Sequence, residues 1–214
     1  MKHHSDELIK KLKLLSLSNT GDQNVALISF LTSLEEIVGV HSVRVAGYAA
    51  ATGRELELPE EKISNLYMSA LLHDIGKLFI PPAILYKAET LNNEELEIIK
   101  GHPAAGCEVL MQVERYGVYS DIVLHHHEFF NGRGYPEGQS GAGIPILSRI
   151  IAVADAYEAM TSERPYRKGF SHREAVTRLK AGRSTQFDPD ITDAFLKAIR
   201  KYSNINLTNQ TISK

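Results

Sequence analysis

Apolar side chains recur every three or four residues along most of this 214-residue chain, and stretches that alternate apolar with polar residues are scarce. Such spacing puts the apolar residues on one face of an α-helix, whereas a half-buried strand needs strict alternation. The sequence therefore predicts an all-α fold built as a helical bundle. A chain of this length can bury a sizeable core as one domain.

Turn-forming residues divide this pattern into separate helices. A basic amphipathic stretch over 5–17 precedes the polar segment SLSNTGDQN, and we expect it to pack as a helix rather than bind a membrane surface. A second helix is expected over 25–52, with a weak point at Gly39. Further helices are predicted from Pro59 to HDIGK, on both sides of a break near Gly101 and Pro103, across SDIVLHHHE, from Pro145 to about 160, over 171–180 and over 189–202.

These helices suggest a simple domain organisation. We expect an N-terminal helix and linker over 1–24, the main domain over 25–203 and a polar C-terminal tail over 204–214. Asn92 or Asn93 is expected to cap the helix before the break at Gly101.

Composition excludes several classes of protein. The formal net charge of -2 argues against general nucleic-acid binding, so no DNA partner is expected. A single cysteine, Cys107, rules out an internal disulfide framework and fits a reducing cytoplasm. The sequence has no apolar run of about eighteen residues, and its polar N-terminus does not resemble a signal peptide. We therefore expect a cytoplasmic protein without a transmembrane segment.

Histidines and aspartates gather at the predicted helices or their ends. Five of the nine histidines and two aspartates form this set: His41, His73, His102, His126, His127, Asp74 and Asp155. Both aspartates lie in apolar runs, where a carboxylate without a cationic partner or a metal would be costly to bury. A metal centre accounts for the whole set, whereas a buried salt bridge to Arg149 or Arg164 would account for Asp155 alone.

The adjacent pairs His73-Asp74 and His126-His127 indicate more than one metal ion. Neighbouring residues on a helix point about 100° apart, so both members of a pair reach one centre only at a helix end. Imidazole and carboxylate donors suit iron, manganese, zinc or nickel. A structural zinc site fits them less well, because such sites usually contain cysteine thiolates. Two ions about 3.5–4 Å apart stabilise the attacking and leaving oxygens of a phosphoryl displacement, which favours a phosphodiesterase.

Several short motifs follow one another in a fixed order between 25 and 202. They are HDIGK at 73–77, HP at 102–103, HHE at 126–128, GYP at 134–136 and RPYR at 164–167. With His41 upstream, this order resembles the HD-GYP family of cyclic di-GMP phosphodiesterases, within the HD-domain metal-dependent phosphohydrolases. The resemblance implies an HD-domain bundle with a Gly-rich GYP loop. It also implies hydrolysis of cyclic di-GMP to pGpG, with onward hydrolysis to GMP left open.

The resemblance also implies roles for individual residues. The metal ligands form two sets, His41, His73, Asp74 and Asp155 for one ion and His102, His126 and His127 for a second ion that Asp74 bridges. Asp74 and Lys77 are the catalytic residues, and Lys77, Tyr135, Arg164 and Arg167 bind substrate. Glu128 is expected to support a neighbouring histidine. Glu158 stands where the family often has Asp near Lys77.

Three of these residues also have simpler interpretations. Lys77 could be only a cation near a helix end, and Arg164 and Arg167 could be ordinary surface residues. Two other histidines are excluded from the site, since His125 is expected to pack or face solvent and His172 to begin a helix. Arg44, Arg133 and Arg183 are expected to lie on the surface or to form structural ion pairs.

One departure from the family pattern bears on the cofactor. Members with a third metal site carry a glutamate four residues before the first histidine, where this chain has Ile37. We therefore expect two divalent ions, iron or manganese, with nickel, zinc and cobalt as alternatives.

The substrate and partners have alternatives too. Another cyclic dinucleotide such as cyclic GMP-AMP could be the substrate, or the chain could bind cyclic di-GMP or a protein without catalysis. A homodimer, and a GGDEF-type or other regulatory protein at the GYP loop, are further partners that stay open.

Overall fold

The computed structural model describes residues 2–16, 29, 39–163 and 168–211. All its regular elements within these ranges are helices, which confirms the predicted all-α fold. The longer helices are α1 (Lys2–Ser16), α3 (Gly39–Glu55), α4 (Glu60–Leu72), α6 (Asn93–Lys100), α7 (His102–Met111), α9 (Ile146–Thr161), α10 (His172–Ala181) and α11 (Pro189–Thr211). The short ones are α5 (Pro82–Leu85), α8 (Ser120–Leu124) and the 3-10 turns η1 (Ile75–Phe79), η2 (Gly117–Tyr119) and η3 (Gly141–Gly143).

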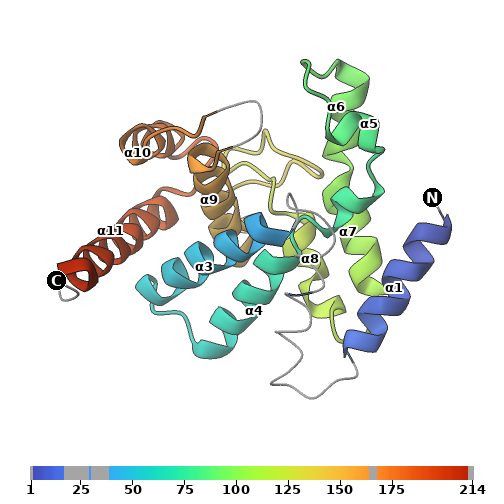
Figure 1. Ribbon diagram of the computed structural model, residues 1–214, viewed down its shortest axis with the longest axis horizontal. Helices are drawn as coiled ribbons and strands as arrows, with labels where there is room; N and C mark the ends of the chain where they lie inside the picture. The colour runs from blue at the N-terminus through green and yellow to red at the C-terminus, as the bar shows by residue number, and fades with distance from the viewer. Residues whose placement is uncertain (1, 17–28, 30–38, 164–167, 212–214) are drawn as a thin grey trace.

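Helix α3 lies at the centre of the bundle and packs against α4, α9 and α11 (Figure 1). Its buried face carries the small residues Ala46 and Ala49, which let neighbouring helices approach closely. Phe195 of α11 is fully buried, with its ring centroid 5.2 Å from Tyr157 and 6.1 Å from Tyr48. This aromatic cluster joins α3, α9 and α11 into one core.

The N-terminal helix α1 belongs to the same core. Its residues Leu8, Ile9 and Leu12 are buried in the cluster that also contains Leu110 of α7. The prediction that this amphipathic stretch is a packing helix is therefore confirmed.

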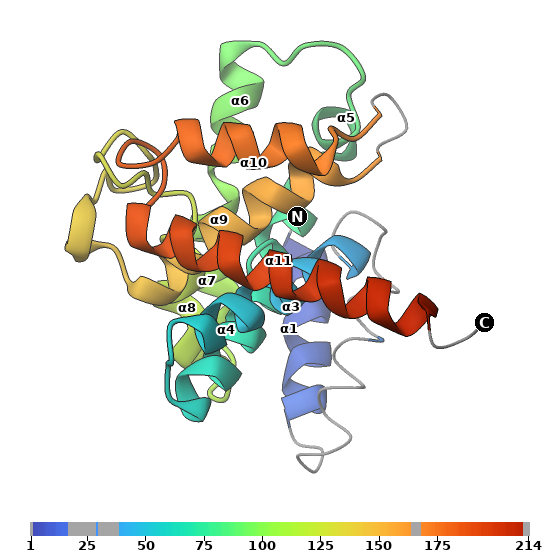
Figure 2. The same cartoon turned by 90° about the vertical axis from the view of Figure 1, so that its left-hand side faces the viewer.

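Most of the predicted helix boundaries agree with the structure. Asn92 caps α6 in a capping box, because its Oδ1 accepts a hydrogen bond from the Glu95 amide while Glu95 accepts one from the Asn92 amide. The expected break falls at Gly101, between α6 and α7. In Figure 2, α5 and α6 lie at the edge of the molecule.

The boundaries differ at three places. The helix expected across SDIVLHHHE ends at Leu124, so His126 and His127 lie in the turn after α8. Helix α11 was expected over 189–202 but continues to Thr211, so the backbone of 204–211 is helical instead of an irregular tail. The first part of the helix expected over 25–52 lies mostly outside the described residues, and α3 is described from Gly39 onward. Within the described ranges, none of the helices has the length and apolar character needed to cross a membrane.

Gly76 fixes how closely η1 approaches α7. A Cβ atom at this position would lie 1.9 Å from the carbonyl oxygen of His102 and 2.6 Å from the amide nitrogen of Gly106. Both atoms are backbone atoms, so a larger residue would force the two segments apart. The chain after α4 can therefore lie against the start of α7 only because residue 76 has no side chain.

We predict that Gly76→Ala lowers the free energy of unfolding by about 3 kcal/mol or more, at the upper end of the cost of overpacking. Gly47→Ala is the matched control, since a Cβ at Gly47 in α3 meets nothing within 4 Å. That control should leave the free energy of unfolding unchanged or raise it by up to about 1 kcal/mol. Urea unfolding followed by circular dichroism measures both, and equal stability of the two variants would contradict the prediction.

Candidate metal centre

The structure brings together all seven residues predicted to bind metal. They come from five places in the bundle, and in three of these the residue stands at a helix end. His41 lies in the first turn of α3, His73 and Asp74 directly follow α4, His102 begins α7, His126 and His127 follow α8, and Asp155 lies within α9. Figure 1 shows these segments meeting at the centre of the molecule.

The seven side chains form two neighbouring groups. Asp74, His102, His126 and His127 each offer a ligand atom within 4.8 Å of the others, and so do His41, His73 and Asp155. Asp74 faces both groups. Its Oδ1 lies 3.3 Å from His102 Nε2, and its Oδ2 lies 3.3 Å from His73 Nε2.

Three histidines are oriented by backbone carbonyls of the preceding helical turn. The Nδ1 atoms of His73, His102 and His126 lie 2.7, 2.8 and 2.6 Å from the carbonyl oxygens of the residues three positions earlier. A carbonyl oxygen can only accept, so each Nδ1 carries the hydrogen and each Nε2 presents its lone pair to the centre when the ring is neutral. Metal-binding histidines are commonly held this way.

The protonation of these groups suits a divalent cation. Burial lowers the pKa of His127 to about 3, and burial followed by the proximity of His127 and His73 holds the pKa of His126 well below its ordinary value. Burial alone would raise the pKa of Asp74, but the nearby His73 and Lys77 hold it well below its ordinary value. The neutral rings of His126 and His127 therefore lie in the same centre as the ionised carboxylate of Asp74.

Two atoms in the centre lack any hydrogen-bond partner although they are buried: His73 Nε2 and Asp74 Oδ1. An unpaired buried polar atom costs about 1–3 kcal/mol. A cation beside both atoms would remove that cost. The residues present therefore fit a metal ion, and this chain has histidine and aspartate groups that could bind a divalent metal.

Glu158 connects to His41 rather than to Lys77. Its carboxylate contacts His41 Nδ1 and the Ser162 hydroxyl, and Arg44 Nη1 lies 3.5 Å from Oε1. Burial lowers the pKa of His41, but the hydrogen bonds to Asp155 and Glu158 outweigh it and raise that pKa to about 10. Glu158 thus fixes the direction of the His41 ring, with Nε2 3.0 Å from Asp155.

The sequence did not single out Ser162 or Arg44 as partners of Glu158. The only signal was their spacing, since Ser162 follows Glu158 by four residues and Arg44 follows His41 by three. Nor does Asp155 pair with Arg149, whose Nη1 lies 2.5 Å from Asp188 instead.

Lys77 lies at the border between the centre and solvent. Its Nζ is 2.6 Å from Asp74 Oδ2, and its side chain keeps 21% of its surface exposed while Asp74 keeps 1%. Its ammonium group is therefore within reach of a molecule that approaches Asp74 from outside.

The GYP loop crosses directly over His127. The Tyr135 amide donates to the His127 carbonyl oxygen at 3.2 Å, and the two rings lie with centroids 5.0 Å apart. A Cβ at Gly134 would lie 2.2 Å from the Phe129 amide nitrogen, so this approach requires glycine. Burial raises the pKa of Tyr135, which keeps its hydroxyl protonated.

Glu128 anchors this loop instead of supporting a histidine as the sequence suggested. Its Oε1 accepts hydrogen bonds from the amides of Glu137 and Gly138 at 2.7 and 3.0 Å. The neighbouring His125 contacts Glu137 Oε2 at 3.1 Å and lies outside both groups of ligands.

Some predicted residues lie outside the described part of the chain. They are Ile37, on which the expectation of two rather than three ions depends, and Arg164 and Arg167 of the RPYR motif.

Comparison with known proteins places the chain in the HD domain family. Residues 26–191 match the HD domain family. Cyclic di-GMP phosphodiesterase PA4108 of Pseudomonas aeruginosa is 36% identical, over 93% of this chain and 48% of its own length. The cyclic di-GMP phosphodiesterase response regulator RpfG of Xanthomonas campestris is 39% identical, over 72% and 41%. A 3'3'-cGAMP-specific phosphodiesterase of Vibrio cholerae is 35% identical, over 78% and 39%.

This chain spans less than half the length of those relatives. Solved structures show the same fold. An HDG"Y"P protein from Bdellovibrio bacteriovorus aligns with a TM-score of 0.63 at 20% identity, covering 93% of this chain and 63% of its own. A cyclic GMP-AMP phosphodiesterase of V. cholerae aligns with a TM-score of 0.60 at 18% identity, covering 92% and 49%. The chain belongs to the HD domain family, and its resemblance to the HD-GYP phosphodiesterases is confirmed.

Proposed function

We propose that this chain is a metal-dependent phosphodiesterase that hydrolyses cyclic di-GMP to pGpG, with a dinuclear centre and a cytoplasmic location. The observation that carries the proposal is the position of Asp74, which is buried between two groups of candidate ligands and faces both. The relatives named cyclic di-GMP phosphodiesterases support the substrate.

Each group of ligands would hold one ion. His41, His73 and Asp155 would bind the first, His102, His126 and His127 the second, and Asp74 both. When bound, two such ions act as Lewis acids that stabilise the attacking and leaving oxygens of a phosphoryl displacement. Imidazole and carboxylate donors favour iron or manganese, with nickel, zinc and cobalt as further candidates.

The remaining residues would bind and orient the nucleotide. Lys77 holds its ammonium group 2.6 Å from Asp74 and would bind a non-bridging oxygen of the scissile phosphate. Tyr135, fixed over His127, would border the substrate, and Arg164 and Arg167 would hold phosphate or guanine through their guanidinium groups. Glu158 is engaged on both oxygens by His41 and Ser162, so it serves to orient His41 and not to donate a proton.

A second substrate is favoured by one observation. Two relatives named as specific for 3'3'-cGAMP are 35% identical to this chain. This identity is close to the 36% of a relative named as a cyclic di-GMP phosphodiesterase. A panel of both cyclic dinucleotides, with product analysis for pGpG and GMP, separates these activities and identifies the final product.

We predict that Asp74→Asn abolishes pGpG formation and lowers the metal content below two equivalents, because the amide cannot supply the bridging negative charge. Metal analysis of anaerobically purified protein and chromatography of the products measure both effects. Asp193→Asn is the control, since Asp193 pairs with Arg183 on the surface and should change neither. Turnover by the Asp74→Asn protein would refute the mechanism.

We predict that Lys77→Met lowers kcat about 10²–10³-fold, the usual cost of removing one charge-stabilising group, while both metal equivalents are retained. Steady-state kinetics with metal analysis test this. Lys87→Met removes an ammonium group that pairs with Glu95, and it should leave kcat unchanged. If kcat fell equally in both variants, or if Lys77→Met lost its metal, Lys77 would have no special role toward the phosphate.

We predict that Glu158→Gln weakens metal binding about 10–100-fold, as expected when a group that orients a metal ligand loses its charge. Glu158→Asp should recover part of the affinity because it keeps the carboxylate. Competition with a chelator measures the affinity without reference to turnover. Glu174→Gln, which removes a carboxylate paired with Arg178 on the surface, is the control. Wild-type affinity in the Glu158→Gln protein would rule out this role.

A further inference from the structure

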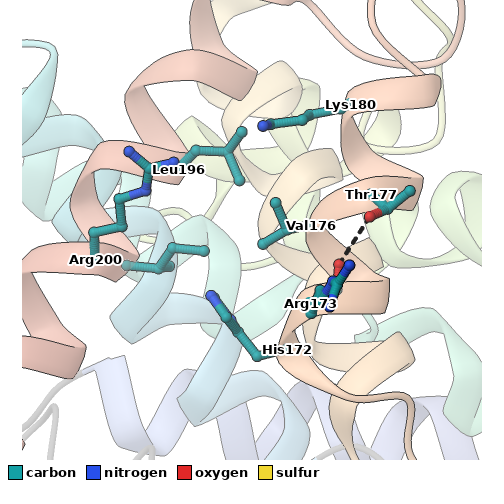
Figure 3. Close-up of a pocket in the computed structure, with 8 residues that line it drawn as sticks. His172, Arg173, Val176, Thr177, Lys180, Leu196 and Arg200 are labelled. Carbon is teal, nitrogen blue, oxygen red and sulfur yellow. Dashed lines mark hydrogen bonds between the residues drawn. The ribbon is translucent and has the colours of Figure 1, made fainter.

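A groove of about 300 Å³ lies between α10 and α11 (Figure 3). Its apolar lining consists of Val176 from α10 and of Leu196 and Ile199 from α11. The two α11 residues are buried below 10% exposure, so they belong to the wall of the bundle. These three side chains form an apolar floor in the groove, which could contact an apolar part of a small molecule.

Positively charged side chains border the groove on both helices. Arg173 and Lys180 are seven residues apart on α10, about two helical turns, and Arg200 extends from α11. Figure 3 shows Lys180 reaching from α10 toward α11, with Arg200 beside Leu196 on the other side. Among the residues that the structure describes, no acidic side chain lines the groove.

These cations differ from others nearby in having no carboxylate partner within the described residues. On the same part of the surface, Arg178 pairs with Glu174 at 2.9 Å and Arg183 pairs with Asp193 at 2.7 Å. Three positive charges around one groove repel one another unless an anion lies between them. The chain has a net charge of -2, so this local excess does not follow from its composition.

His172 adds a polar group to the end of the groove. It begins α10, and its Nδ1 lies 2.8 Å from the Tyr157 hydroxyl of α9. That contact holds the ring in place and leaves Nε2 as the nitrogen available to a ligand.

We propose that this groove between α10 and α11 is a second binding site, which takes a small phosphate-bearing molecule. Guanidinium and ammonium groups are the side chains that suit phosphate oxygens best. The volume lies at the lower end of the range for small-molecule sites, which fits inorganic phosphate or a mononucleotide. In a mononucleotide, the nucleoside would cover the apolar floor.

The groove is separate from the metal centre. Asp155 and Tyr157 are two residues apart on α9, so their side chains point about 200° apart around the helix. Asp155 faces His41, and Tyr157 faces His172. A ligand in the groove therefore lies on the other side of α9 from the proposed catalytic site, and the proposal does not depend on the proposed function.

Methyl NMR on the metal-loaded protein can report on the two places at once. Val176, Leu196 and Ile199 report on the groove, while Ile75 and Val123 report on the metal centre. The protein is titrated with inorganic phosphate and, in a second arm, with GMP, against chloride at equal ionic strength. We expect saturable chemical-shift changes of the groove methyl groups. If the ligand is a nucleotide, the changes saturate at a lower concentration of GMP than of phosphate. If it is free phosphate, GMP and phosphate saturate the changes at equal concentrations.

The variant Lys180→Glu/Arg200→Glu should weaken binding at the groove at least about tenfold, because two charge-assisted hydrogen bonds are lost. Lys62→Glu/Lys197→Glu makes the same change of net charge on exposed side chains that do not line the groove, and it should bind like the wild type. Ile75 and Val123 should respond to phosphate and to GMP in both double variants as they do in the wild type. If the groove methyl groups do not shift, shift without saturation, or respond equally in both double variants, the proposal is wrong.

Discussion

The carboxylate of Asp74 is the group on which the rest of the site depends. It is 1% exposed, and its two oxygens face different histidines at 3.3 Å, His73 on one side and His102 on the other. Burying an ionised carboxylate is costly unless cations or strong donors surround it. Here Lys77 and the histidines provide that surrounding, and one of the carboxylate oxygens still lacks a hydrogen bond. The bundle thus supports a buried negative charge that faces both groups of candidate ligands.

Helix ends explain how so many ligands can meet. A residue in the middle of a helix is held at a fixed angle to its neighbours, but at the end of a helix two consecutive side chains can face one point. His73, His102 and His126 use such positions, and each ring is fixed by a carbonyl of the preceding helical turn. Gly76 then lets η1 lie against α7, and Gly134 lets the GYP loop lie over His127. Glycine at these two positions therefore sets how closely the elements of the site approach.

The sequence predicted more of the helices and the ligand set than of the contacts that orient them. Helical periodicity and the breaks at Gly101 and Pro145 located the elements, because both depend on local chemistry. The two aspartates could be selected because a carboxylate in an apolar run needs a partner, and the ordered motifs that resemble the HD-GYP family assigned the histidines beside them. The partners of Glu158 and Glu128 were not predictable in this way. The contact of Glu158 with His41 joins segments far apart in the chain, and the contacts of Glu128 depend on how the GYP loop folds back over it, which a single sequence does not reveal.

Helix α9 lies between the candidate metal centre on one side and the groove on the other. On one side Asp155 meets His41 of α3, and on the other Tyr157 meets Tyr48, Phe195 and His172. Burial of the Tyr157 side chain raises its pKa to about 12. Its hydroxyl therefore stays protonated for the contact with His172. The aromatic cluster of Tyr48, Tyr157 and Phe195 therefore packs α9 against α3 and α11, and Tyr157 extends this packing to His172 at the edge of the groove.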